Sequence, residues 1–537
     1  MNFWKSKWKG NKRNKEPSSS MLDTSQETRL TTSLDENVQT VKKVFKNDAD
    51  FSTRSFHLFN NIPATSLFIS SLVDKEKINR DIIQPLQEKR SSNNEESANS
   101  TKKDLLQSLL NDYLYFADGE KKQDLSSLLD GLLHGKTVIL LDGESQYLLL
   151  DTLKTEKRSI EQPETERVVR GPRDGFIEQM ESNISLLRYR LPVPEFRVEP
   201  FEVGEKTKTK VSVCYLDNVV SDALLEEVIK RIQDISIDRI LDAGYIEQFI
   251  QDNPRSPFPQ VQNTERPDKA VGNILEGRVI ILVDGSPFAL IVPAVFNQFY
   301  QTSEDYAGRT IIMSIIRVIR FLSLIFSLTF SSLYITIVSF HPEMIPAQFV
   351  VAASSGRAGV PFPVVVEVLL MEVAMEILRE ATIRMPQQVG GALSIVGVLV
   401  IGEAAVSAGF VSPITVVIIA LSTIGSFATP SYNAAIAFRL LKFPLIILSG
   451  FIGLLGLAVG LMFIINHMIS LRSFGVPYLS PVSPWNKQGF KDSLIRAPLR
   501  WLTERPAELQ PKDKVRVESG VESGPTNPFK RKGENDE

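Results

Sequence analysis

The pattern of apolar and polar positions divides this chain of 537 residues into two unlike parts. Up to about residue 310, apolar runs are only a few residues long and alternate with amphipathic stretches and turn residues, which predicts strands alternating with helices. Residues 311–470 are overwhelmingly apolar, in segments long enough to cross a bilayer as helices. The pattern therefore predicts an α/β N-terminal region followed by an all-α polytopic membrane domain.

One line of sequence in the α/β region occurs twice, as GKTVILLDGES from Gly135 and as GRVIILVDGSP from Gly277. Each copy is a short aliphatic run closed by Asp-Gly and followed by more apolar residues. This predicts a β-hairpin, because glycine tolerates the positive φ of a tight turn. Upstream of each copy lies an apolar strand, an Asp cap and an amphipathic helix. We interpret the repeat as two related subdomains, 51–160 and 161–310, and a chance pairing of two common motifs is the alternative.

The GKT of the first copy also resembles the end of a phosphate-binding loop. That loop requires a glycine five residues before Gly135, where Asp130 stands, and it should open a helix rather than a strand. The chain has only four histidines, and its sequence contains neither an HExxH motif nor a Cys/His cluster. We therefore predict that the protein is not an enzyme and that it binds no cofactor and no metal.

Charge and cysteine content narrow the class of protein further. The formal net charge is −3, which provides no basic field for nucleic acid. Cys214 is the single cysteine, so it forms no internal disulfide and fits a reduced compartment. Polar composition predicts disorder in residues 1–50, in 471–537 and in an insert at 88–103. The basic, tryptophan-containing start of the chain is expected to contact anionic lipid, with a solvated tail as the alternative.

Four apolar segments of the predicted membrane domain, 311–470, are expected to cross a bilayer: 321–340, 389–410, 414–438 and 443–465. Basic residues cluster before the first segment and after the last, which places both ends, and hence the N-terminal region, in the cytoplasm. Arg439 and Lys442, between the last two segments, would then lie outside, which leaves the side of the C-terminal tail open.

Between the first two segments, PFPVVVEVLLMEVAMEILREATIRMP predicts a helix over residues 362–383. Glu372, Glu376 and Glu380 follow at i, i+4 and i+8 and form a slanting acidic stripe, and Glu367 precedes them. In one interpretation the helix lies on the membrane surface with its glutamates in solvent. In the other it re-enters or spans the membrane and lines a path for ions, because charge at that depth faces water or a partner.

Single residues in the later segments are further candidates. Glu403 stands alone in the second segment, and it is either functional or merely protonated or hydrogen-bonded between helices. Gly453, Gly456 and Gly460 lie in the last segment. The spacing of the latter two permits close helix contact, within the chain or with another subunit.

Two charged loops complete the set of candidate residues. In RGPRDGF, Arg170 and Arg173 could bind an anion or pair with nearby carboxylates such as Asp174, and the structural role is preferred. Glu265 and Arg266 lie in TERPD, a similar charged loop positioned by proline.

Several stretches together resemble the A subunits of GerA-type spore germination receptors of endospore-forming bacteria. They are VVRGPRDGFIEQMESNISLLRYRL, SPFPQVQNTERPDKAVGNILEGRVIILVDGSPFALIVPAVF, PFPVVVEVLLMEVAMEILREA and LRSFGVPYLSP, and the resemblance runs from about residue 50 to 485. It implies a subunit of a nutrient-sensing complex in the spore inner membrane, with a transporter-like B subunit and a lipoprotein C subunit as partners. It also implies that A subunits form homo-oligomers, which could be channels that release cations early in germination.

The leading hypothesis is therefore a germinant receptor subunit that couples nutrient sensing to ion release. A secondary transporter with a cytoplasmic regulatory domain is the alternative, motivated by the charged helix and by Glu403. The small number of spans and the lack of an evident inverted repeat favour the receptor.

Overall fold

The computed structural model describes residues 29–59, 62–87, 105–114, 116, 119–154, 162–384 and 402–516. The predicted insert at 88–103, the basic first fifteen residues and the tail beyond residue 516 lie outside this set. The chain divides into two compact units. Unit 1 comprises Met1–Ser159, Ile184–Glu199 and Leu216–Asn218, and unit 2 comprises Ile160–Asn183, Pro200–Tyr215 and Val219–Glu537.

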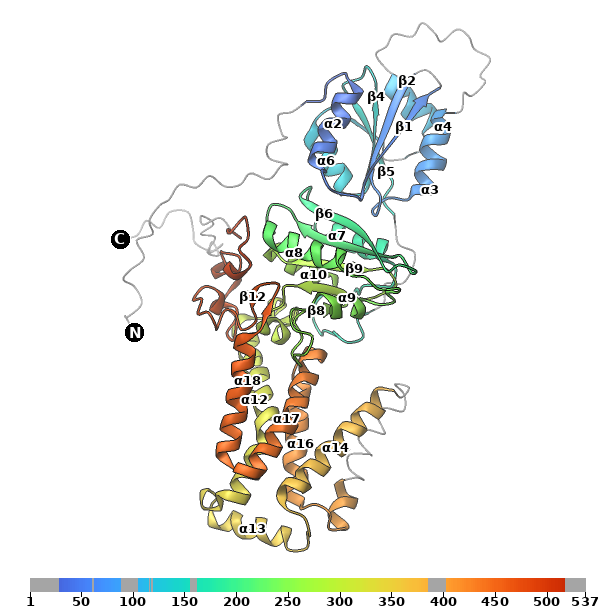
Figure 1. The fold of residues 1–537 in the computed structure, drawn as a ribbon. Coiled ribbons are helices and arrows are strands. Elements are labelled where there is room, and N and C mark those ends of the chain that lie inside the picture. The colour runs from blue at the N-terminus through green and yellow to red at the C-terminus, as the bar shows by residue number, and fades with distance from the viewer. Residues whose placement is uncertain are drawn as a thin grey trace, which may run out of the picture. The chain divides into compact units, whose positions relative to one another are not determined.

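Unit 1 contains a five-stranded antiparallel sheet between two layers of helices (Figure 1). Its strands are β1 (Phe51–Leu58), β2 (Ile62–Ile69), β3 (Glu120–Lys122), β4 (Lys136–Leu141) and β5 (Tyr147–Asp151), in the spatial order β1-β2-β4-β5-β3. Its helices are α2 (Leu34–Val44), α3 (Lys75–Lys77), α4 (Gln84–Gln87), α5 (Leu105–Ser108) and α6 (Leu125–Leu133), with π-helical turns at Ile78–Ile83 and Leu109–Tyr113.

The sheet of unit 1 has a separate apolar core on each face. Val138 and Leu140 of β4 pack with α2 and α6, whereas Ile139 and Leu141 pack with the helical segments that follow β2. Successive side chains of a strand point to opposite faces, so a continuous aliphatic run is what a strand covered on both faces requires.

Helix α2 corrects the prediction that residues 1–50 are disordered. Leu34 and Val41 of this helix are buried, and Phe45 follows in the same core. The composition of the segment is polar, but the spacing of seven residues from Leu34 to Val41 places both side chains on one helix face. A narrow apolar stripe is therefore enough to order a helix in a segment whose average composition is polar.

A second sheet repeats the topology of the first. Its strands are β6 (Phe196–Val203), β7 (Thr209–Leu216), β8 (Gln262–Thr264), β9 (Val279–Val283) and β10 (Ala289–Val292), in the order β6-β7-β9-β10-β8. Its helices are α7 (Met180–Arg190), α8 (Asp222–Gln233), α9 (Ala243–Ile250) and α10 (Pro267–Glu276). The hairpins β4–β5 and β9–β10 occupy equivalent positions, so both predicted Asp-Gly hairpins are confirmed. Gly143 and Gly285 have φ of 84° and 87°, as such turns require.

The first Asp-Gly turn anchors the helix that begins its subdomain. The Asp142 carboxylate accepts the backbone N–H of Leu34 at the start of α2 (3.4 Å). The N–H of Gly143 donates to the carbonyl of Thr32 (3.0 Å). The turn thus supplies an acceptor to the first turn of a helix more than a hundred residues away, where backbone N–H groups lack partners within the helix.

The second Asp-Gly turn makes the same contacts. The Asp284 carboxylate accepts the N–H of Met180 at the start of α7 (3.3 Å), and the N–H of Gly285 donates to the carbonyl of Glu178 (2.8 Å). The repeated line of sequence therefore preserves a turn that holds an N-terminal helix against the sheet, and the repeat includes α2 and α7 as well as the strands.

A buried asparagine in the first turn of each of these helices binds the backbone just before that helix. The side-chain N–H of Asn37 donates to the carbonyl of Thr31 (2.6 Å), and its Oδ1 accepts the N–H of Thr31 (2.9 Å). Asn183 makes the same pair of bonds with Ile177, at 2.6 and 2.9 Å. Four matching hydrogen bonds at equivalent positions favour duplication over a chance pairing of motifs.

Replacing either asparagine with alanine should weaken the fold. Asn37→Ala and Asn183→Ala should each lower the free energy of unfolding by about 1–3 kcal/mol, because each removes two hydrogen bonds that contribute about 0.5–1.5 kcal/mol apiece. Denaturant unfolding of the purified chain would measure this loss. Asn218→Ala is the control, since Asn218 is exposed and should change stability by less than about 0.5 kcal/mol. If all three variants were as stable as the wild type, the two buried asparagines would not have this stabilising role.

Glu247, in α9, should make the stability of the second α/β subdomain depend on pH. Burial, with a smaller contribution from Asp242, raises the pKa of Glu247 to about 7. The folded state therefore binds the proton more tightly than the unfolded state, whose carboxyl has a pKa near 4.5. The resulting stability is fully present below about pH 4.5 and is lost as the pH rises through about 7.

Glu247→Gln should remove this dependence and raise stability at pH 8 by up to about 3 kcal/mol, at about 1.36 kcal/mol per unit of pKa. Thermal unfolding of the detergent-solubilised chain between pH 5 and 8 would test it. Glu226→Gln, at an exposed position of α8, should keep the wild-type profile. Identical profiles for wild type and Glu247→Gln would refute the proposed titration.

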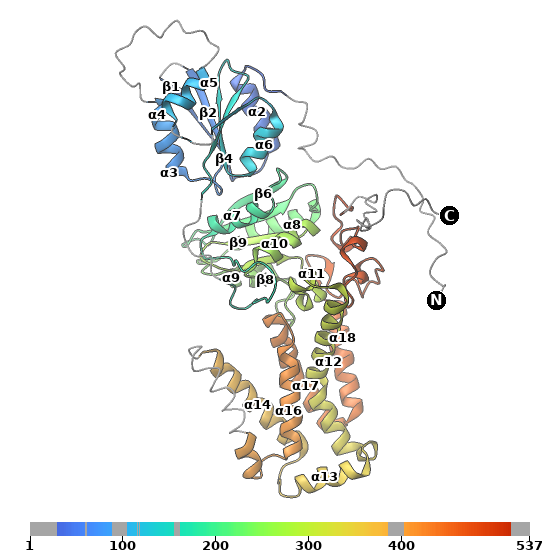
Figure 2. The same cartoon turned by 180° about the vertical axis from the view of Figure 1, so that it is seen from behind.

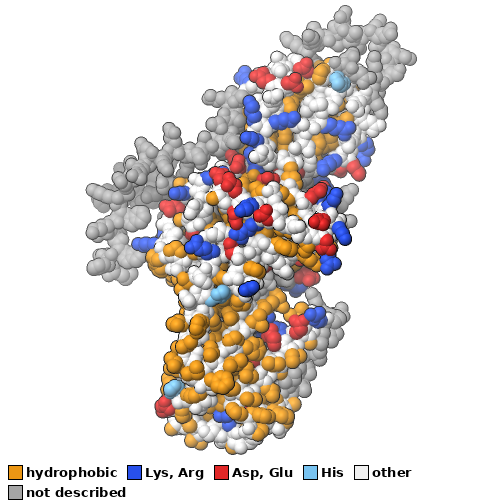
Figure 3. Space-filling view, viewed as in Figure 1, with side chains coloured by type: hydrophobic (Ala, Val, Ile, Leu, Met, Phe, Trp, Pro, Cys, Tyr) orange, Lys and Arg blue, Asp and Glu red, His pale blue; other side chains and the backbone are white. Residues whose placement is uncertain are grey.

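The rest of unit 2 is mainly helical. Its helices are α11 (Glu304–Ala307), α12 (Thr310–Phe340), α13 (Ala347–Arg357), α14 (Val364–Ile383), α16 (Pro413–Phe427), α17 (Tyr432–Ile452) and α18 (Leu454–Ser470). Figures 1 and 2 show α12, α16, α17 and α18 side by side. Within the described residues, α12 and α17 are long and apolar enough to cross a membrane, and α16 and α18 are shorter apolar helices. Hydrophobic side chains dominate the face of these helices seen in Figure 3.

The boundaries of the last two predicted spans, 414–438 and 443–465, are wrong. Helix α17 runs through Arg439 and Lys442, which were assigned to a loop, and ends at a sharp turn around Gly453. Hydropathy breaks a span at charged residues, but both of these cations have acidic partners on α14. Conversely, Gly453 has a φ of 63°, and hydropathy does not register such a turn in a continuous apolar run. The predicted span 389–410 lies mostly outside the described residues.

The segment after α18 corrects the prediction that residues 471–537 are disordered, because residues 471–516 are ordered. It contains β11 (Arg472–Ser473), β12 (Val476–Pro477) and three 3-10 turns, Gly489–Lys491, Leu499–Trp501 and Ala507–Leu509. Ser473 Oγ accepts the N–H of Ala294 (3.0 Å) and donates to the carbonyl of Gln260 (2.7 Å). Lys512 pairs with Asp222 at 2.7 Å. Scattered apolar residues and side-chain hydrogen bonds order a segment whose average composition is polar.

Candidate functional site

Helix α14 carries the acidic stripe, and the helix predicted over 362–383 is confirmed. Pro363 takes the N-cap position, where its fixed φ of −62° suits a helix start. The first half of the helix packs against α12, α16 and α17, and Glu367 and Glu372 are among its buried residues. The interpretation in which all of the glutamates face solvent is therefore wrong for these two.

Glu367 is fully buried and its carboxylate has partners on both oxygens. One oxygen pairs with Arg357 Nε at 3.1 Å. The other accepts the N–H of Ser412 (2.9 Å) and the hydroxyl of Thr415 (3.0 Å) at the start of α16. This carboxylate therefore joins α13, α14 and α16, and its first role is structural.

Glu372 forms the centre of a polar cluster inside the helices. Both of its oxygens accept from Lys442 Nζ of α17, at 2.9 and 2.8 Å, and one also accepts from Ser331 of α12 (2.7 Å). Lys442 Nζ also donates to Ser422 of α16 (3.1 Å). Glu372 and Lys442 are each only 5% exposed, so one ion pair and two hydroxyls hold four helices together.

Glu376 is shared by two arginines. Arg379 Nη1 donates to one oxygen (3.0 Å), and Arg439 Nε lies 3.4 Å from the other. Arg379 also donates to Ser426 of α16 (3.3 Å). The trio therefore carries two positive charges and one negative charge.

The remaining two carboxylates lie nearer the surface. Glu380 pairs with Arg384 at 2.6 Å, and both side chains are largely exposed. Glu403 lies in a short helical stretch and is also exposed, so it forms no part of the buried cluster in this chain. The glutamates of α14 therefore differ in their surroundings. Glu367 and Glu372 are buried and paired with cations, Glu376 is shared by two arginines, and Glu380 is exposed.

The glycines after α17 allow two helices to approach closely within the chain. Gly453 forms the turn between α17 and α18. A side chain at Gly456 would meet the backbone oxygen of Leu448 at 2.2 Å, and one at Gly460 would meet Leu445 at 2.4 Å. The close contact expected from the glycine spacing is therefore found between α17 and α18.

The loop RGPRDGF contacts the short helix that precedes α12. Arg170 and Arg173 are exposed, and Asp174 is partly buried. The backbone N–H of Arg170 donates to Glu304 of α11 (3.1 Å). Anion binding and structural pairing of these arginines both stay predictions.

The loop TERPD is buried and tied to its surroundings. Glu265 accepts the N–H of Thr165 (3.2 Å). Arg266, only 2% exposed, pairs with Asp268 at 2.7 Å and donates to the carbonyl of Pro172 (3.1 Å). These contacts give Arg266 a structural role in joining two loops.

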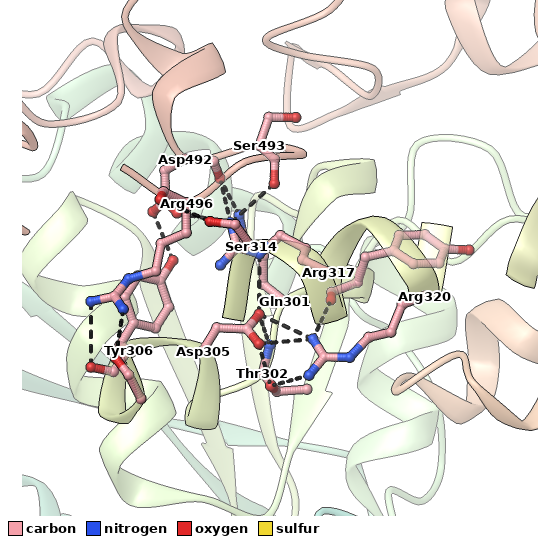
Figure 4. A network of polar contacts seen from close by, with 12 residues as sticks. Gln301, Thr302, Asp305, Tyr306, Ser314, Arg317, Arg320, Asp492, Ser493 and Arg496 are labelled. Atoms are coloured by element: carbon pink, nitrogen blue, oxygen red, sulfur yellow. Dashed lines mark hydrogen bonds and ion pairs between the residues drawn. The ribbon is translucent and has the colours of Figure 1, made fainter. Parts of the chain in front are cut away.

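A further cluster of charges, which the sequence analysis did not single out, lies at the start of α12 (Figure 4). Asp305 of α11 is fully buried and accepts from Arg317 Nε (3.2 Å) and Arg320 Nη1 (2.9 Å). Arg317 Nη1 also pairs with Asp492 of the C-terminal segment at 2.9 Å. Two arginines three residues apart at the edge of an apolar helix were an available signal, but their acidic partners could not be read from spacing.

Two groups of this cluster outside α12 have altered acidity. Burial raises the pKa of Tyr306 well above its ordinary value, so its hydroxyl keeps its proton and donates to Asp492 (2.7 Å). Burial also raises the pKa of Asp492, although Arg317 opposes the shift. The cluster joins the segment before α12 to the segment after α18, so both ends of the helical region lie at the same end of the bundle.

Comparisons with known proteins cover nearly all of the described chain. A family model described as "Bacillus/Clostridium GerA spore germination protein" matches residues 39–508. The chain is 42% identical over 490 residues to "Spore germination protein KA" of Bacillus subtilis (strain 168), covering 91% of this chain and 88% of that protein. It is 35% identical over 485 residues to "Uncharacterized membrane protein YfkQ" of the same organism, covering 90% and 93%. The "Crystal structure of the N-terminal domain of the A subunit of the Bacillus megaterium spore germinant receptor GerK3" is 30% identical, with a TM-score of 0.40, and is matched over 50% of this chain and 98% of that chain.

Proposed function

The chain belongs to the GerA family of spore germination proteins, and from this premise we propose that it is the A subunit of a nutrient germinant receptor in the spore inner membrane. Its role in spore germination follows from the family. The finer role, coupling nutrient sensing to ion release, is the proposal. Its partners would be a transporter-like B subunit, a lipoprotein C subunit and further copies of this chain.

The helical region would be the membrane domain. The long apolar helices α12 and α17, the apolar helices α16 and α18 and the hydrophobic surface around them support this placement. So does the similarity to a protein named as a membrane protein. The end of the bundle that holds the start of α12 and the end of α18 would face the cytoplasm, since Arg309, Arg317 and Arg320 lie at the start of α12. The α/β region would then be cytoplasmic.

The buried charges of α14 are the observation that carries the proposed coupling. Charge inside a membrane domain is expensive and marks functional positions. Glu372 is neutralised by Lys442 of the same chain, so a cation could use this carboxylate only after the pair separates. The pair would thus hold a closed state, and rings of Glu372 and Glu376 in an oligomer would attract cations once it opens.

Deleting the gene in frame should abolish the germination response to at least one nutrient, and re-expression should restore it. An unchanged response to every nutrient, with no related chain compensating, would remove the receptor assignment.

Variants that remove the carboxylate charges test the ion path. Glu376→Gln should slow cation release from spores at normal protein abundance, and the double variant Glu372→Gln/Lys442→Met, which removes both the pair of the closed state and a carboxylate of the path, should change its rate. Glu343→Gln is the control, because Glu343 is exposed after α12 and should leave release unchanged. Wild-type release in both test variants would rule out these carboxylates as an ion path.

A further inference from the structure

A large open groove runs between α14, α16 and α17. Its volume is about 870 Å³, and most of its wall is apolar, with contributions from Leu378, Ile383, Ile424 and Phe427. Three of these side chains are highly exposed, at 56% for Ile383, 65% for Ile424 and 69% for Phe427. Thr429 and Pro430, in the loop between α16 and α17, lie at one end of the groove.

The charges along the groove do not balance. Arg379 and Arg439 line it and share the single carboxylate of Glu376. The neighbouring carboxylates are engaged elsewhere, Glu372 with Lys442 and Glu380 with Arg384. Arg439 Nε, moreover, is buried and makes no hydrogen bond among the described residues, although it lies 3.4 Å from Glu376. An apolar groove with one surplus positive charge suits an occupant that is both anionic and apolar.

In the proposed membrane placement, the two arginines would lie near the level of the lipid headgroups, close to the loop between α16 and α17. Arg439 lies seven residues into α17, which corresponds to about 10 Å of helix rise from the loop end of the groove. Arg379 stacks over Phe427 and Arg439 over Tyr432, at 5.1 and 5.9 Å from the ring centroids, so aromatic rings hold both guanidinium groups in place.

We propose that this groove binds one anionic phospholipid, whose phosphate is held by Arg379 and Arg439 and whose acyl chain lies against α14 and α16. Guanidinium groups bind phosphate oxygens through paired N–H donors, and the apolar wall accepts the chain. The inference rests on the proposed membrane location, which supplies the ligand at high local concentration.

Lipid titration of the purified full-length chain in mild detergent tests the proposal. Phosphatidylglycerol should raise the thermal midpoint, whereas phosphatidylcholine with the same acyl chains and inorganic phosphate should not. Arg379→Gln/Arg439→Gln should weaken phosphatidylglycerol binding by at least about tenfold, since two charge-assisted contacts are lost. Arg379→Lys/Arg439→Lys should recover part of it.

Two further variants separate binding from folding. Glu376→Gln should strengthen phosphatidylglycerol binding, because it removes the carboxylate that competes for both arginines, and a merely structural trio predicts no such gain. Arg384→Gln, on the same helix and 78% exposed, should bind as wild type does. Equal response to the two lipids, equal response to inorganic phosphate, or unchanged binding in the double Gln variant would overturn the proposal.

A photoreactive residue at Ile424 identifies the occupant directly. Irradiation in membranes should give an adduct with the mass of a phospholipid. A cross-link to a second copy, or to another part of this chain, would show that protein fills the groove and would overturn the proposal. Release of the chain from membranes by alkaline carbonate would instead defeat the proposed membrane location. If the chain stays in the membrane but does not discriminate between the two lipids, the lipid-binding proposal fails and the proposed membrane location stands.

Discussion

The Lys442→Met variant should fail to accumulate as folded protein. Removing the ammonium leaves the Glu372 carboxylate buried without a cation, with only the Ser331 hydroxyl as a partner in the cluster. Breaking a buried ion pair in this way costs about 3–5 kcal/mol, which is a large part of the total stability of a typical domain. Thermal unfolding of the detergent-solubilised chain and its abundance in membranes would measure the loss.

The double variant Glu372→Gln/Lys442→Met should recover most of that stability, because neither charge then remains in the bundle. Arg384→Met removes one partner of the exposed pair with Glu380 and should change stability by less than about 1 kcal/mol. If Lys442→Met proved as stable as wild type, or if the double variant were no better than the single one, the pair would not organise the four helices.

The Arg317→Met variant should release the C-terminal segment from the start of α12. It would leave Asp305 with Arg320 and Thr302, and Asp492 with the Tyr306 hydroxyl, both in buried surroundings. The expected loss is about 3–5 kcal/mol locally, because two carboxylates lose a shared guanidinium. Limited proteolysis of the solubilised chain should then cut within residues 480–500 many times faster.

Arg317→Lys keeps the charge but not the fork that reaches both carboxylates, and it should fall between wild type and Arg317→Met. Arg309→Gln is the control, because Arg309 is exposed at the N-cap of the same helix. Unchanged cleavage in Arg317→Met would mean that other contacts of the segment suffice to hold it.

Local patterns predicted the elements whose signals lie within about ten residues. The Asp-Gly hairpins and helix α14 follow from turn chemistry and from proline and apolar spacing, and the structure contains all of them. The long-range contacts of these turns could not be predicted from local patterns, since Asp142 accepts a hydrogen bond from Leu34, 108 residues away.

Charges inside helices were the main source of error. Lys442 and Arg439 looked like a loop because a single sequence does not show that Glu372 and Glu376 face them from α14. The same limitation concealed the cluster at the start of α12, whose acidic members lie 12 and 175 residues from Arg317. Pairing across such separations depends on the folded topology and leaves no periodic trace.

The docking of residues 472–516 onto the second α/β subdomain has a consequence for biosynthesis. Phe474 belongs to the apolar core of that subdomain, and the backbone N–H of Phe474 donates to Asp252 (2.6 Å). A ribosome delivers these residues only after every helix of the bundle has been made. The sheet of unit 1 can therefore close while the chain is still being translated, whereas the core of the second subdomain is completed only when the last part of the polypeptide emerges.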